Sequence, residues 1–296
     1  MIKRYSTFLL ALPFLTLAAS SLQAQNYSKH DRYRSVGVSL NGLSYFGDIT
    51  PERGMGGLRL GSTRPGIALT ATQRFTERIS ARVAFSYGRI KGQDVKAIDD
   101  HDANAQMRYA RNINFRNDIT ELSATGVFDL VENWEDYLRR PDFVPYVFAG
   151  VAVFHHNPKG FIEGGTVPEG LIERTYVALQ PLRTEGQSAG YSRTQFALPF
   201  GGGVRYRITK EMDVSLEVGW RKTFTDYLDD VSGTYTDVSK LTSPEALYFG
   251  HDVTRDDSKA MPGQARGNSQ RHDWYMVTGV TVQYIVPQFR NTFKLR

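Results

Sequence analysis

Apolar and polar residues alternate along many short segments of this chain, and the alternation is cleanest just after residue 211. One parity of that segment is apolar and consists of Met212, Val214, Leu216, Val218 and Trp220. The other parity is small or polar and consists of Asp213, Ser215, Glu217, Gly219 and Arg221. Because successive side chains of a β-strand point to opposite faces, the pattern predicts a strand with one apolar and one polar face.

A period of two also marks most of seven further segments, so the sequence predicts an all-β protein with eight strands. Segment 143–155 is apolar on both parities, so its facing stays open. The connections alternate between long and short, and an antiparallel meander then has four long loops on one side and three short turns on the other. The strands are expected near residues 35–47, 64–75, 79–90, 113–130, 143–155, 193–208, from 212 onward, and 274–286.

Two environments could accommodate such strands. In a soluble barrel the apolar parity would face inward around a ligand, whereas in a membrane barrel it would face lipid and the polar parity would face the interior. Arg82, Glu121, Arg205 and Glu217 share the polar parity, and the loops on one side are long. These features favour an eight-stranded antiparallel transmembrane β-barrel of the outer-membrane type, with four long extracellular loops and three short periplasmic turns.

The amino-acid composition further limits the kinds of protein that this chain can be. The chain of 296 residues contains 16 Tyr, 17 Phe and 27 Gly, and aromatic residues suit both strands and the interfacial girdles of a membrane barrel. It contains no cysteine, which excludes disulfides, iron–sulfur clusters, thiolate zinc sites and a lipidated N-terminal cysteine. Basic residues are scattered rather than clustered with aromatic ones, so no nucleic-acid partner is expected.

The first residues have the layout of a secretory signal. Lys3 and Arg4 precede an apolar run over residues 8–19, and Ala24 offers a small residue for cleavage before Gln25. An uncleaved anchor is the alternative, although the run is short for a membrane span. The expected organisation is a signal peptide over residues 1–24, a periplasmic lead over 25–34, the barrel over 35–286 and a periplasmic tail over 287–296.

Eight strands enclose an interior that side chains can just fill, so charged residues of the inward parity should meet there. Such residues would form either a packed polar core or a path for protons or solutes; the packed core is favoured, and a diffusion porin is not expected. Pro145 and Pro199 lie within strands and cannot donate ladder bonds, which predicts local bulges. The expected lumen charge network consists of Arg74, Arg82, Glu121, Arg205, Arg207, Glu217 and Arg221.

Three His–Asp pairs on the long-loop side raise the question of hydrolytic chemistry. They are His101 with Asp102, His251 with Asp252, and His272 with Asp273. A membrane protease or lipase could use such a dyad beside a serine, but solvated loop residues are the plainer interpretation. His155 and His156 point to opposite faces of a strand and cannot chelate one ion together. No catalytic residue is expected, and the chain is predicted not to be an enzyme.

A cluster of acidic residues in the last long loop is the one candidate for metal binding. Asp226, Asp229 and Asp230 could hold a divalent cation at the barrel mouth, because hard cations prefer carboxylates. Their spacing matches no calcium loop, so a solvated acidic rim is favoured. The glycine triplet at 201–203 lies within a strand and lacks the helix and lysine of a phosphate loop. No metal and no cofactor is therefore expected.

Six stretches stand out as a set. They are SYFGDI (44–49), FSYGRIKGQD (85–94), RNINFRN (111–117), PYVFAGVAVFHHNP (145–158), FTDYLDDVSGTY (224–235) and DWYMVTGVTVQY (273–284). Together they resemble the PorG-type outer-membrane proteins of the type IX secretion apparatus in Bacteroidota. The resemblance spans roughly residues 26–286, and it rests on the stretches as a set because each alone is a short strand-and-loop pattern.

That resemblance implies a non-enzymatic barrel in contact with outer-membrane lipids. Such a barrel associates with a periplasmic ring, built from a lipoprotein and its partner, and assists protein export and gliding motility. The loops over 157–192 and 226–271 are long for that family, which keeps a second hypothesis open: a surface adhesin or small-ligand-binding barrel. The residues expected to contact a periplasmic partner are Trp134, Tyr137, Arg290, Lys294 and Arg296.

Overall fold

The computed structural model describes residues 32–49, 60–94, 111–163, 169–251 and 261–287. The expected signal peptide and all of the expected C-terminal tail except Pro287 lie outside these ranges. Within them, no helix has both the length and the apolar character needed to cross a membrane.

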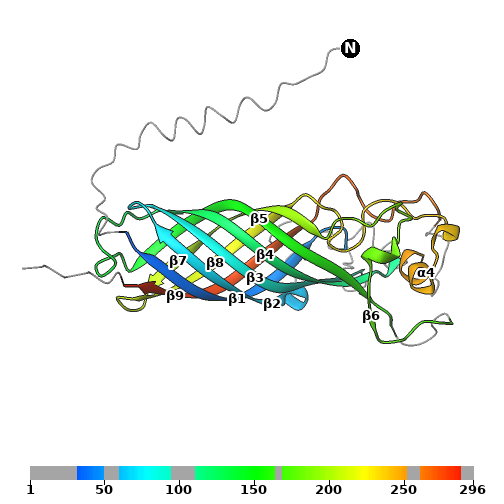
Figure 1. The fold of residues 1–296 in the computed structure, drawn as a ribbon, viewed down its shortest axis with the longest axis horizontal. Coiled ribbons are helices and arrows are strands. Elements are labelled where there is room, and N and C mark those ends of the chain that lie inside the picture. Colours follow the sequence, from blue (N-terminus) through cyan, green and yellow to red (C-terminus); the bar gives the residue numbers. More distant parts are fainter. Residues whose placement is uncertain (1–31, 50–59, 95–110, 164–168, 252–260, 288–296) are drawn as a thin grey trace, which may run out of the picture.

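Eight strands close into a ring, which Figure 1 shows from the side. Each strand pairs antiparallel with its neighbours in the order β1-β2-β3-β4-β5-β7-β8-β9, and β1 closes the ring by pairing with β9. The predicted eight-stranded antiparallel barrel is therefore confirmed. The strands are β1 (Arg34–Phe46), β2 (Arg64–Arg74), β3 (Ile79–Gln93), β4 (Asn114–Asp129), β5 (Phe143–Phe161), β7 (Thr194–Arg207), β8 (Met212–Thr223) and β9 (Trp274–Val286).

The long and short connections emerge at opposite ends of the barrel. Three short turns, the start of β1 and the end of β9 lie at the end where Arg34 pairs with Val286, which is the periplasmic end in the predicted topology. The long connections form the other end, on the right in Figure 1. They carry the short strand β6 (Tyr176–Ala178) and the 3₁₀ helices η2 (Leu60–Ser62), η3 (Gln180–Leu182) and η4 (Val238–Lys240).

The described part of the long-loop end also carries α4 (Pro244–Gly250), an α-helix of seven residues. It begins at Ser243, whose hydroxyl accepts a hydrogen bond from the Ala246 amide at 3.1 Å. Pro244 follows in the first turn. Backbone N–H groups in that turn have no partner within the helix, so the missing N–H of proline costs no hydrogen bond.

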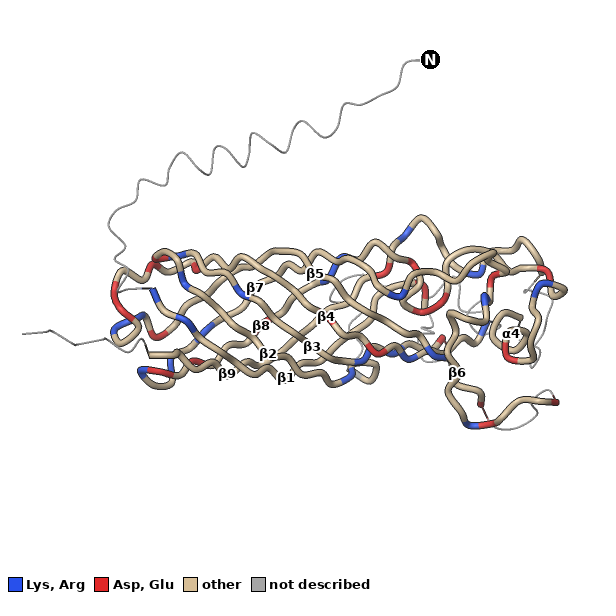
Figure 2. Tube along the Cα trace, in the orientation of Figure 1, with Lys and Arg blue, Asp and Glu red and all other residues tan. Residues whose placement is uncertain are grey.

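In the strands that have a single apolar parity, that parity faces outward, as the sequence predicts. On β8, Leu216 and Val218 are 53% and 42% exposed, whereas Asp213 and Ser215 are 3% and 2% exposed. A polar face that is buried and an apolar face that is exposed is the reverse of a soluble barrel, and it is the arrangement a lipid bilayer requires. Charged residues concentrate toward the two ends of the barrel in Figure 2.

The structure also gives the facing of β5, which is apolar on both parities. Val147 and Val151 are exposed, whereas Tyr146, Phe148 and Phe154 are buried. Large side chains therefore enter the lumen from β5, and they do so opposite the small residues of the glycine triplet at 201–203 on β7, since Tyr146 pairs with Gly203 and Phe148 with Gly201.

Two expectations about strand geometry are wrong. β5 ends at Phe161, six residues beyond the predicted end at 155, because residues up to Lys159 still pair with β4 and the last three pair with β6. No bulge accompanies either strand proline. β5 and β7 keep one register from the Phe143–Tyr206 pair to the His155–Thr194 pair, and the ladder is only interrupted beside Pro199.

The lipid-facing assignment predicts a depth-dependent cost for a charge on the outer surface. Val218→Arg, in the middle of β8, should lower the free energy of unfolding in phospholipid vesicles by about 2–4 kcal/mol. Val286→Arg, on the same surface but at the end of β9, should lower it by about 0–1 kcal/mol. Urea titrations followed by tryptophan fluorescence measure both; equal small effects at the two positions would contradict a lipid-facing β8.

Candidate functional site

The periplasmic half of the barrel interior is filled by charged side chains that pair across the lumen. The Asp129 carboxylate of β4 accepts hydrogen bonds from Arg74 of β2 at 2.7 Å and from Arg205 of β7 at 2.5 Å. The Arg74 and Asp129 side chains are 3% and 1% exposed. Burial of charge is costly, and the cost is offset only while each charge keeps an opposite partner.

A second layer of ion pairs lies nearer the middle of the lumen. Arg82 of β3 donates to Glu217 of β8 at 2.6 Å, and these two strands are on opposite sides of the ring. Arg221 of β8 lies 3.6 Å from Glu121 of β4. Because the contacts join opposite walls, they fix the barrel's cross-section as well as neutralise its interior.

The structure brings six of the seven predicted network residues into the lumen. Arg207 differs, because it lies at the periplasmic rim, where it pairs with the exposed side chain of Asp142. The prediction omitted Asp129, although Asp129 shares the inward parity of Glu121. It also omitted Tyr146, whose hydroxyl donates to Glu217 at 3.0 Å, since the facing of β5 is not readable from its sequence.

A small polar chamber adjoins the ion pairs. Its volume is about 50 Å³, and Ser39, Thr70, Ser123 and Glu217 contribute to its wall. A buried water needs roughly 10–15 Å³ of such space, so the chamber has room for a few waters. A sugar-sized solute does not fit.

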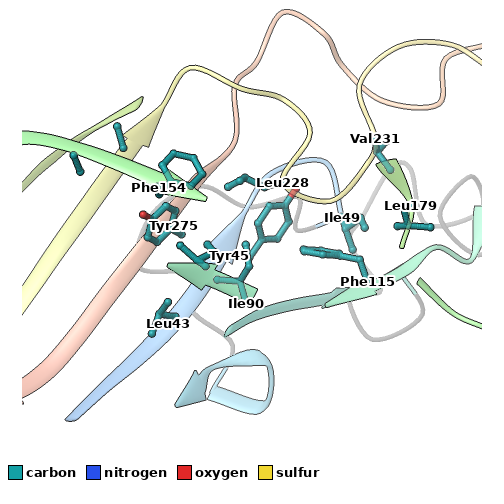
Figure 3. Close-up of a cluster of buried hydrophobic side chains, with 13 residues drawn as sticks. Leu43, Tyr45, Ile49, Ile90, Phe115, Phe154, Leu179, Leu228, Val231 and Tyr275 are labelled. Carbon is teal, nitrogen blue, oxygen red and sulfur yellow. The ribbon is translucent and has the colours of Figure 1, made fainter. Parts of the chain in front are cut away.

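Toward the extracellular end, the inward parity turns apolar, which the sequence analysis did not anticipate. Ile90 of β3, Phe115 and Ile119 of β4 and Phe154 of β5 are each at most 2% exposed. Figure 3 shows Ile90, Phe115 and Phe154 in one cluster with residues of the loops. We call the buried set the apolar collar: Leu43, Tyr45, Ile49, Ile90, Phe115, Ile119, Ala152, Phe154, Leu179, Ala197, Leu228, Val231 and Tyr275.

Two members of the collar come from a loop and close the barrel mouth at its extracellular end; we call them the plug. Leu228 and Val231 belong to the connection between β8 and β9, and both are 0% exposed. On the barrel side, the rings of Tyr45 and Phe115 meet edge to face with centroids 4.8 Å apart. The outer half of the lumen is thus a hydrophobic core made jointly by strands and loop.

The extracellular loops form a cap over the collar, which we define as residues 169–193, 224–251 and 261–273. Its central cation is Arg266, 2% exposed, which donates to the Glu185 carboxylate at 3.0 Å and to the Asp230 carbonyl at 2.6 Å.

The Asp230 carboxylate joins the two long loops of the cap. It accepts hydrogen bonds from the Thr184 hydroxyl at 2.5 Å and the Tyr191 hydroxyl at 2.6 Å. Burial raises the pKa of Asp230 to about 6, although the nearby Arg266 opposes the shift. Since Thr184 and Tyr191 belong to one loop and Asp230 and Arg266 to the other, the network ties the loops into one unit.

Two of the three aspartates considered for a cation, Asp229 and Asp230, point to different partners. Asp229 accepts a hydrogen bond from Tyr45 at the barrel mouth, whereas Asp230 points into the cap and pairs with Arg266 and its neighbours. Among the residues that the structure describes, no three acidic or histidine side chains are grouped to hold a metal ion.

The histidines form no visible catalytic dyad in the described part of the chain. His272 is exposed while Asp273 is fully buried, and the Asp273 carboxylate accepts instead from the Leu228 amide at 2.9 Å. His156 is buried in the lumen side of β5 and His155 is exposed, as their adjacency predicts. His101, Asp102 and Asp252 lie outside the described residues.

The periplasmic turn over residues 130–142 is held at both flanks. On one side Arg78 pairs with Glu132 at 2.7 Å and donates to the Leu130 carbonyl at 3.0 Å. On the other side Arg140 pairs with Asp213 at 2.5 Å and donates to backbone carbonyls of the neighbouring turn at 208–211. The three periplasmic turns are therefore joined into one platform.

Two of the predicted partner-contact residues lie on that platform. Trp134 is 47% exposed, and its indole N–H donates to Glu132 at 2.8 Å. Tyr137 is half-buried, with its ring edge-on to Tyr33 at 6.4 Å between centroids. Of these two residues, Trp134 has the more exposed side chain. The other three predicted residues, Arg290, Lys294 and Arg296, lie outside the described part of the chain.

Comparison with known proteins gives a family. The model of the family described as "Domain of unknown function (DUF6089)" matches residues 11–263. The chain belongs to the DUF6089 family. No curated protein matches it.

The DUF6089 chain is also similar to solved structures of small outer-membrane proteins. They include Ail, the attachment invasion locus protein of Yersinia pestis (11% identity, 86% of this chain and 97% of that chain, TM-score 0.36). They also include neisserial surface protein A (11% identity, 86% and 96%, TM-score 0.35) and OprG from Pseudomonas aeruginosa (10% identity, 88% and 98%, TM-score 0.38). At these scores the likeness carries no argument about function.

The ion pairs of the DUF6089 barrel predict unequal costs for two acidic residues. Asp129→Asn leaves the buried guanidinium groups of Arg74 and Arg205 without a counter-charge and should lower the free energy of unfolding by about 3–5 kcal/mol. Glu132→Gln breaks an ion pair that is exposed on both sides and should leave it unchanged within error. Chemical denaturation in detergent micelles compares the two; a neutral Asp129→Asn variant would contradict a lumen held by paired charge.

The collar and the ion pairs together predict a closed barrel. Purified protein in liposomes should give no swelling in isosmotic sugar solutions, because the apolar collar and two charged layers occupy the lumen in series. A general diffusion porin in parallel liposomes is the positive control. Sugar uptake above that of empty liposomes would show that the lumen opens.

Proposed function

We propose that this DUF6089 barrel is a non-enzymatic outer-membrane component of the type IX secretion machinery, which docks a periplasmic ring built from a lipoprotein and its partner. The observation that carries the proposal is the combination of an occluded lumen with a periplasmic platform whose three turns are joined by ion pairs and hydrogen bonds. An occluded barrel moves no cargo through itself, so its contribution to secretion is made by its surfaces.

The platform supports docking because it is fixed and exposes an aromatic side chain. Arg78 and Arg140 hold the turn over residues 130–142 from both sides, so binding would order little additional chain. Preorganised surfaces bind with a smaller entropic cost, and tryptophan is among the residues that most often dominate an interface. The sequence resemblance to PorG-type proteins supplies the identity of the ring.

A gentle-detergent pull-down with the tagged full-length protein tests the docking. The wild-type barrel should co-purify the ring lipoprotein, and Trp134→Ala should weaken the interaction by about 2 kcal/mol, roughly 30-fold in affinity. Val238→Ala is the matched control, because Val238 is an exposed apolar residue at the opposite, extracellular end. Equal recovery of the ring with both variants would contradict docking through the platform.

Secretion itself gives an independent readout. Deletion of the gene should abolish export of cargo that carries the type IX C-terminal signal, and wild-type protein supplied in trans should restore it. Normal export in the deletion strain would reject the secretion role whatever the pull-down gives.

The extracellular cap favours a second candidate, a surface adhesin or small-ligand-binding barrel. Two long loops that are tied together by a buried arginine form a defined surface rather than loose chain. Ile172 and Val238 are 75% and 41% exposed on that surface. If Ile172→Asp with Val238→Asp abolishes surface or ligand binding while secretion continues, the adhesin role is favoured over the secretion role.

A further inference from the structure

The cap meets the barrel mouth at a buried cluster of two carboxyl groups and one phenol. The Tyr45 hydroxyl, at the end of β1, lies 2.5 Å from Asp229 Oδ2 and 2.9 Å from Asp273 Oδ1. All three side chains are at most 3% exposed. Asp229 lies in the loop between β8 and β9, Asp273 is the residue immediately before β9, and Tyr45 lies in the barrel wall. The cluster therefore joins three separated parts of the chain.

Proton counting shows that the cluster needs one additional hydrogen. A phenol has a single O–H and donates to one acceptor. If both carboxyl groups were ionised, one of them would face the lone pairs of the Tyr45 oxygen at hydrogen-bond distance. Both short contacts are hydrogen bonds when the Tyr45 hydroxyl donates to Asp229 and a protonated Asp273 carboxyl donates to the Tyr45 oxygen.

The backbone contacts fit this assignment. Asp229 Oδ1 accepts from the Val231 amide at 3.0 Å, which suits an ionised carboxylate. Asp273 Oδ2 accepts from the Leu228 amide at 2.9 Å, which leaves Oδ1 to carry the hydrogen. Leu228 and Val231 are the residues that plug the apolar collar, so the cluster holds the plug directly.

The charged surroundings favour retention of the proton. Asp48, Asp94 and Asp226 lie around the cluster together with the Tyr235 hydroxyl, and Arg111 is the nearby cation in the described chain. Arg111 is already paired with Asp94 at 2.7 Å. Burial raises the pKa of Asp229 and of Asp273 well above the ordinary range; Asp48 adds to the shift at Asp229, and Asp229 and Asp226 add to it at Asp273.

We propose that one proton held by Asp273, in addition to the hydroxyl hydrogen that Tyr45 donates to Asp229, latches the extracellular cap and its plug onto the barrel mouth, and that rising pH releases them. The folded cap binds this proton more tightly than the unfolded loop does. Its stabilising effect is therefore complete below the unfolded carboxyl pKa of about 3.9 and is lost as pH rises through the folded pKa. Release would uncover the apolar collar while the strand ladder stays closed.

Hydrogen exchange on the full-length protein in micelles tests the latch. Exchange of the cap amides over 224–235, divided by the intrinsic chemical rate at each pH, should rise with pH, with a limiting slope of tenfold per pH unit for one linked proton. Amides of β3 serve as the internal reference and should stay protected at every pH.

Asp273→Asn is the decisive variant. The asparagine amide can donate to Tyr45 from the Oδ1 position while its carbonyl still accepts from Leu228, so it mimics the protonated state at every pH. The cap should stay protected at alkaline pH with a flat profile. Asp237→Asn, an exposed acidic residue of the same cap, should retain the wild-type profile.

Three results would overturn the proposal. They are a flat wild-type profile, a wild-type pH dependence in Asp273→Asn, and a cap that is unprotected at every pH in Asp273→Asn while β3 stays protected.

Discussion

Closure of the strand ladder is the constraint on which the rest of this structure depends. A bilayer core offers no water to backbone N–H and C=O groups, so strands can cross it only if every edge is paired. Pairing of β1 with β9 and of β4 with β5 satisfies that requirement. Once the ring is closed, strict alternation sends every second side chain into lipid and the others into a narrow interior, where polar and charged residues survive only with partners.

The interior meets that demand in two different ways along its length. Near the periplasm, cross-lumen pairs such as Arg82 with Glu217 neutralise charge and hold opposite walls together. Near the extracellular end, residues such as Phe115 and Phe154 replace charge by hydrophobic burial, with Leu228 of the cap completing the core. Both solutions occlude the lumen along the part of the chain that the structure describes.

Much of the fold was predictable because alternation is local: the side chains of β8 face as their parity requires. The end of β5 was not predictable, because residues 157–161 resemble a loop in composition. They form a strand only by pairing with β4 and β6. The lumen charges were predictable from strand parity except at Arg207. Arg207 is the last residue of β7, so its side chain lies at the periplasmic rim rather than in the lumen. The collar and the Tyr45, Asp229 and Asp273 cluster depend on contacts between distant segments, which no local pattern reports.

The environment of each side chain along β8 in a bilayer can be measured directly. The chain has no cysteine, so single cysteines at positions 214–220 can carry spin labels whose collision rates with oxygen and with a water-soluble nickel chelate are measured. A lipid-facing exterior around a sealed lumen predicts a period of two, with even positions accessible to oxygen and odd positions shielded from both reagents. Odd positions open to the nickel chelate, or accessibility without a period of two, would contradict a lipid-facing exterior around a sealed lumen.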